Sequence, residues 1–83
     1  MTKIPLFERV ALRRDLGQHG LKTGDVATLI EYVAHPTGAP DGCVLEVFNA
    51  LGESIAVVAV NAADIEPLHS GEVLSVRPLA QAG

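Results

Sequence analysis

The sequence predicts a small domain built from β-strands. Glycine and proline, eight and five of the 83 residues, recur at short intervals. The segments between them are rich in valine, isoleucine and leucine, as strands separated by turns are. No segment repeats its apolar residues at the spacing of an amphipathic helix. The length suits one domain over residues 1–83.

The first half of the chain predicts three strands joined by two loops. Residues 7–13 alternate between apolar and polar side chains, as a half-buried strand does. Residues 14–25 carry three glycines and predict a long ordered loop. The next strand, 26–34, has apolar residues on both faces, so we expect it to bend strongly. The glycine- and proline-rich segment 35–42 is a loop, and alternation resumes over 43–49.

The second half predicts a hairpin, a short helical turn and a last strand. Residues 50–53 form the hairpin turn, and the continuous apolar run 54–60 is the returning strand. Asn61 is expected to cap one turn of 3₁₀ helix that Pro67 prevents from continuing. The last strand is expected over 72–77. The predicted core comprises Val10, Leu12, Val26, Ile30, Leu45, Val47, Val57 and Ile65.

The order of these elements predicts a five-stranded SH3-like barrel with one short 3₁₀ turn. Strand, long loop, strand, loop, strand, tight hairpin, strand, helical turn and strand follow one another in that fold. Closing the sheet would remove most of its exposed edges. We expect the barrel to occupy about residues 7–78 and residues 79–83 to form a frayed tail.

Two segments, 19–31 and 46–58, resemble an uncharacterised family of small bacterial domains. The first reads HGLKTGDVATLIE and the second EVFNALGESIAVV, and the resemblance extends over about residues 10–68. Less closely, the loop and strand resemble the KOW motif of ribosomal and transcription proteins and the SH3-like part of the nitrile hydratase β subunit. The resemblance implies the barrel fold and no established activity. Ala27, where glycine is commoner, and the longer loop after Ala34 depart from the pattern.

The charge balance argues against nucleic acid and membrane partners. The chain has six lysines and arginines and ten acidic residues, which gives a net charge of -4. This sign is wrong for neutralising phosphates or anionic lipids. Arg9, Arg13 and Arg14, with Lys22 or Arg77, could still form a basic patch. A salt-bridged, solvated face is the expectation, since acidic residues surround these positions and no aromatic platform accompanies them.

Cys43 is the single cysteine, so no internal disulfide can form. We expect its side chain to be a small buried hydrophobe. The N-terminal residues lack the apolar run of a signal peptide, and no segment reaches the ~20 apolar residues of a membrane span. A cytoplasmic protein is expected.

No residue pattern predicts a catalytic, metal or cofactor site. The loop residues that could supply ligands or acid–base groups lack the spacing of known motifs, and Leu21 interrupts a superficial likeness to a phosphate-binding loop. The serines stand in no nucleophile motif. Part of the loop 14–25 is instead expected to be a recognition loop. The residues weighed are His19, His35, His69, Asp15, Asp25, Asp41, Gly17, Gly20, Lys22, Thr23, Ser54, Ser70 and Ser75, and the recognition loop comprises His19, Lys22 and Asp25.

The leading functional prediction is a non-catalytic interaction module that associates with copies of itself. Successive residues of a strand point to opposite faces, so one apolar row of strand 54–60 must face outward. We expect Ile55, Val57 and Ala59 to fill the barrel. The predicted interface is the opposite row with two residues of the paired strand: Ala56, Val58, Val60, Val44 and Phe48.

Three other functions are weighed. The first alternative is an antitoxin or immunity-type protein that binds and inhibits a partner enzyme, which suits the small size and acidic balance. A nucleic-acid-binding domain of the KOW kind is disfavoured by charge, and an enzyme is disfavoured by the missing residue patterns.

Overall fold

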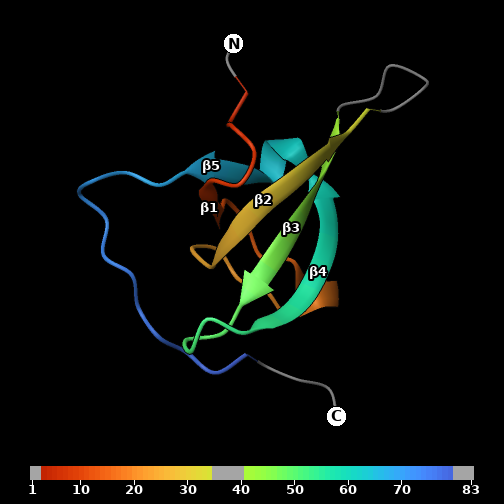
Figure 1. The fold of residues 1–83 in the computed structure, drawn as a ribbon. Coiled ribbons are helices and arrows are strands. Elements are labelled where there is room, and N and C mark those ends of the chain that lie inside the picture. The colour runs from red at the N-terminus through yellow and green to blue at the C-terminus, as the bar shows by residue number, and fades with distance from the viewer. Residues whose placement is uncertain (1–2, 35–40, 80–83) are drawn as a thin grey trace.

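A computed structural model of the chain describes residues 3–34 and 41–79 (Figure 1). Five strands form one antiparallel sheet in the order β4-β3-β2-β1-β5. The predicted all-β class is confirmed. The strands are β1 (Arg9–Leu12), β2 (Val26–Val33), β3 (Gly42–Phe48), β4 (Ser54–Asn61) and β5 (Ile65–Pro67).

The helical content of the described residues is two short 3₁₀ turns, η1 (Gly17–His19) and η2 (Ala62–Asp64). The turn predicted after Asn61 is confirmed as η2, although the Asn61 side chain makes no capping hydrogen bond. Ile65 follows directly and is buried, as expected. Within the described ranges, no helix has the length and apolar character needed to cross a bilayer.

The β3–β4 hairpin is organised by the side chain of Asn49. Its Oδ1 accepts hydrogen bonds of 2.9 Å from the backbone N–H groups of both Leu51 and Glu53. Its Nδ2 donates to the Glu53 carboxylate at 2.8 Å. Gly52 adopts a φ of 84°, a conformation that favours glycine. These contacts explain why the predicted hairpin turn forms at residues 50–53.

The core lies on one face of the sheet. Alternation on β3 buries Cys43, Leu45 and Val47, as predicted. Two other expected core residues, Val26 and Ile30, are only half-buried. Val26 lies opposite Ala11 on the outer face, and Ile30 lies in a bulge of β2. The core cluster comprises Val10, Leu12, Leu16, Leu21, Ala27, Leu29, Cys43, Leu45, Val47, Val58, Val60 and Ile65.

The prediction that Ile55, Val57 and Ala59 of β4 point into the interior is wrong. Val58 lies opposite Leu45, and Val60 lies opposite Cys43. Directly paired residues of an antiparallel sheet share a face, so this register places both valines in the core. Each is 9% exposed, whereas Val57 is 60% exposed. Ala56, Val58 and Val60 therefore pack inward, and the outer row is Ile55, Val57 and Ala59.

The sheet remains open, so the predicted closed barrel is not observed. β4 and β5 are its two ends and do not pair with each other. The last strand expected over residues 72–77 is also wrong, because these residues form no strand. Residues 68–79, which we name the C-terminal strap, run as an extended arch outside the sheet (Figure 1). Leu79, expected in the frayed tail, packs against the core, and residues 80–83 lie outside the described residues.

The facing of β4 predicts opposite results for two neighbouring substitutions. Val58→Glu would place a carboxylate in the core, so we expect a loss of about 3 kcal/mol or more of folding free energy. Val57→Glu would place the same group in water, and we expect a change of at most about 1 kcal/mol. Urea unfolding of both variants in dilute solution measures the difference. Equal losses would contradict the observed register.

Candidate functional site

The long loop between β1 and β2 is closed by its own leucines. Leu16 and Leu21 form an isolated antiparallel bridge, with backbone hydrogen bonds of 2.9 and 3.2 Å. Both side chains are buried. Between them η1 turns the chain, and Gly20 takes a φ of 70° that suits glycine. The leucines hold the loop against the core and present its polar residues to solvent.

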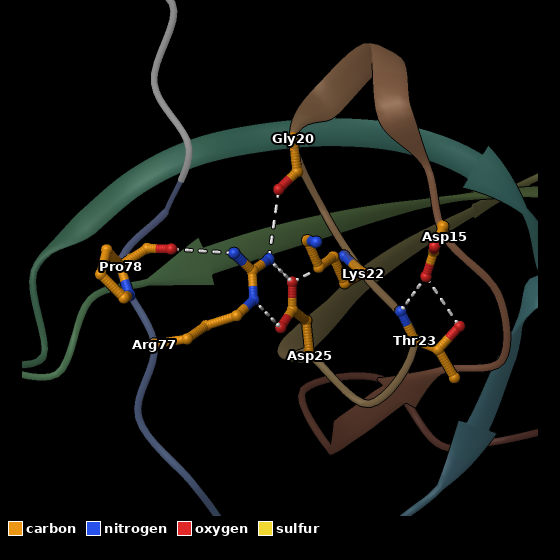
Figure 2. Close-up of polar contacts among 7 residues, drawn as sticks. All are labelled: Asp15, Gly20, Lys22, Thr23, Asp25, Arg77 and Pro78. Carbon is orange, nitrogen blue, oxygen red and sulfur yellow. Dashed lines mark hydrogen bonds and ion pairs between the residues drawn. The ribbon is translucent and has the colours of Figure 1, made fainter.

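Asp15 fixes the returning half of this loop through Thr23. The Asp15 Oδ1 atom accepts hydrogen bonds from the Thr23 backbone N–H at 2.8 Å and from its hydroxyl at 3.0 Å (Figure 2). The backbone N–H of Thr23 is the main cause that lowers the pKa of Asp15, and the Thr23 hydroxyl adds to it. Both bonds favour the ionised carboxylate.

Asp25 joins the loop to the C-terminal strap. The Arg77 guanidinium donates from Nε to Asp25 Oδ1 at 3.0 Å and from Nη2 to Asp25 Oδ2, a bidentate pair (Figure 2). Nη2 also donates to the Gly20 carbonyl at 3.2 Å, and the Lys22 N–H donates to Asp25 Oδ2 at 2.8 Å. The hydrogen bond with Asp25 is the main cause that raises the pKa of Arg77. We name this contact the Arg77–Asp25 latch.

A groove of about 1010 Å³ separates the strap from the body of the domain. The latch and Leu79 anchor one end of the strap, and the strap begins directly after β5 at the other. Between these anchors Val73 and Val76 are 90% and 88% exposed. The groove is lined by apolar side chains together with charged residues from β1, the loop, β5 and the strap: Arg9, Arg13, Lys22, Asp25, Glu66, Glu72 and Arg77.

The three residues of the predicted recognition loop do not form one site. Lys22 and Asp25 line the groove, but Asp25 is already bound by Arg77 and by the Lys22 backbone. His19 lies outside the lining, with its Nε2 atom 3.3 Å from the Gln18 amide nitrogen. The loop therefore uses its aspartates to hold its own shape and to hold the strap.

Sequence reasoning missed the latch. Its two partners are 52 residues apart, and Arg77 lies in a segment that the sequence predicts as a strand. Nothing local in either segment indicates the pairing. A three-dimensional contact of this kind has no sequence signal in a single chain.

The expected salt-bridged face is confirmed for Arg13 and Arg14. Arg13 lies 3.8 Å from a carboxylate oxygen of Glu66, and Arg14 lies 3.2 Å from one of Asp64. Together with Arg77, these arginines already face acidic partners, so their positive charge is locally offset. Such exposed pairs contribute little to stability, about 1 kcal/mol at most.

Among residues 3–34 and 41–79, no group of three or more potential ligands could hold a metal ion, and His35 lies outside these ranges. Asp41 pairs with Lys3 at 3.0 Å. Cys43 is buried as predicted, and burial raises its pKa, with a smaller contribution from the negative charge of Asp64.

The Asp15 contact predicts a pH dependence. A carboxyl whose pKa is lowered by folding stabilises the fold above its unfolded pKa of about 3.8, and this contribution disappears as the pH falls through the folded-state value. We expect the Thr23 amide resonance to titrate with a midpoint below 3.8. In Asp15→Asn this titration should vanish. A midpoint above 3.8 would show that the hydrogen bonds do not form.

The latch predicts a local effect of Arg77 substitutions. Arg77→Lys keeps the charge but cannot form the bidentate pair, so we expect it to release the strap almost as fully as Arg77→Ala. The ¹⁵N heteronuclear NOE of Leu79 should fall in both variants, while the sheet resonances stay unchanged. Arg13→Ala, which removes a longer surface pair, is the matched control. An ordered Leu79 in Arg77→Ala would contradict the latch.

Comparison with known proteins identifies a family. No curated protein and no solved structure is significantly similar to the chain. A family model, described as a domain of unknown function (DUF4926), matches residues 6–67. This range covers well over half of the chain and contains all five strands, whereas the strap and Arg77 follow it. The expected relationship to an uncharacterised family is confirmed, and the chain belongs to the DUF4926 family.

Proposed function

We propose that this domain is a non-catalytic interaction module that associates with copies of itself. The observation that carries the proposal is the apolar surface left uncovered on the outer side of the β3–β4 hairpin. Phe48, Ile55 and Val57 are each between 41% and 60% exposed there. Val44 and Ala59 lie opposite each other on the same face.

The energetics of this surface support association. The inner row of β4 already supplies the core, so its outer row adds nothing to the interior of the monomer. Exposed apolar area costs free energy in water at about 25 cal/mol per Å². Contiguous apolar patches of a few hundred Å² commonly mark interaction sites. The high apolar content of the chain, 48%, is accounted for if part of it is buried between molecules.

Other features fit a protein partner better than a nucleic acid. The net charge is -4, and the arginines at positions 13, 14 and 77 already face carboxylates. Few cations remain to neutralise phosphates. Inhibitory binding of a separate enzyme would use the same apolar surface, and it becomes the conclusion if the purified domain is monomeric but binds a neighbouring gene product.

Val57→Glu tests the proposal. Because this side chain points into water, the variant should fold normally yet fail to associate, since association of two copies through β4 would bring the two new negative charges close together. Light scattering coupled to size-exclusion chromatography at tens of micromolar measures the mass. Val73→Glu places the same charge on the strap and should leave the mass unchanged. A monomeric wild-type protein, or an unchanged assembly in Val57→Glu, would overturn the proposal.

A further inference from the structure

We infer that two copies pair through the free edge of β4, antiparallel about a two-fold axis, to form one continuous ten-stranded sheet. This inference rests on the proposed self-association and specifies its geometry. The open sheet ends in two edge strands, β4 and β5. An edge strand offers unpaired backbone groups that can accept another strand.

The two edges differ in their protection. β5 is three residues long, carries the charged Glu66 and ends at Pro67, which lacks an N–H group. Short length, charge and proline are the features that prevent pairing at an edge. β4 is eight residues long and contains neither a charged residue nor a proline. The unprotected edge of this sheet is therefore β4.

The hydrogen-bond pattern shows which backbone groups of β4 are free. The Ala62 N–H donates to the carbonyl of Asp41, directly opposite, at 3.0 Å. In an antiparallel ladder every second pair of opposite residues is joined by backbone hydrogen bonds. The pairs Val60–Cys43 and Val58–Leu45 are therefore also hydrogen-bonded.

Val57 and Ala59 alternate with these hydrogen-bonded residues along β4, so their backbone groups point in the opposite direction. The backbone N–H and C=O groups of Val57 and Ala59 therefore point away from β3. Among residues 3–34 and 41–79, no residue outside β3 forms a backbone hydrogen bond with Val57 or Ala59. These two residues offer the donors and acceptors that a second strand needs.

A second copy of β4 fits this edge. Two identical strands in antiparallel register are related by a two-fold axis, so each copy donates and accepts the same bonds. The chain carries a net charge of -4, but β4 itself is uncharged, and two copies of it meet without repulsion at the contact. Pairing would also bring the side chains of Val57 and Ala59 against their counterparts.

Edge pairing is favoured over stacking of two outer faces. Glu46 lies beside Val57 on that face, and Glu31 lies beside Val44. Stacked faces would bury these carboxylates without partners, at a cost of several kcal/mol. Edge pairing leaves both carboxylates in water. The apolar row of β4 then contributes contacts without desolvating a charge.

Amide hydrogen exchange of the wild-type protein tests the pairing directly. The Val57 and Ala59 amides should exchange slowly at high protein concentration and rapidly on dilution. The Val60 amide, which bonds to β3 within one copy, is the internal control and should stay protected at both concentrations. Rapid exchange of Val57 and Ala59 in an assembled sample would overturn the edge geometry and leave self-association standing.

Val57→Pro and Val57→Thr form a matched pair of variants. The proline removes an N–H that makes no bond within the monomer, so we expect a folded protein whose dimer dissociation constant rises at least about tenfold. The threonine keeps the N–H and nearly the same shape, and we expect a change below about threefold. Sedimentation equilibrium measures both constants. An unchanged constant for Val57→Pro would contradict the inference, and a wild-type monomer would overturn the proposed function with it. If Val57→Pro does not fold, the exchange experiment decides.

Discussion

The register between β3 and β4 is the constraint on which the rest of this structure depends. Cys43, Leu45 and Val47 alternate toward one face and so define where the core lies. Pairing of β4 against them sends Val58 and Val60 into that core. The same pairing leaves the other row of β4 in water, and it turns the backbone groups of alternate residues toward a free edge.

Around this sheet, polar contacts of the loop residues set the shape of the surface. Asp15 holds Thr23, and Asp25 holds both the Lys22 backbone and Arg77 (Figure 2). These groups are partly exposed, so their value lies more in fixing geometry than in stabilising the fold. The strap that Arg77 anchors follows the family-matched range, residues 6–67.

An open sheet with one protected and one unprotected edge suits the pairing that we propose. A chain of 83 residues buries a limited core, and pairing with a second copy adds buried area without lengthening the chain. The edge of β4 and its outer apolar row would act together, because Val57 contributes both a free backbone group and an exposed side chain. The proposed function and its geometry therefore depend on the same strand.

The sequence by itself determined the β class, the hairpin at Gly52, the inner row of β3 and the 3₁₀ turn before Ile65. Each of these depends on local properties, namely alternation, turn-forming residues and a proline stop. Only the tertiary structure decided the facing of β4, because the uninterrupted apolar run 54–60 gives no periodicity by which to choose a face. It also decided the openness of the sheet and the pairing of Arg77 with Asp25, since contacts between segments 52 residues apart leave no local pattern in one sequence.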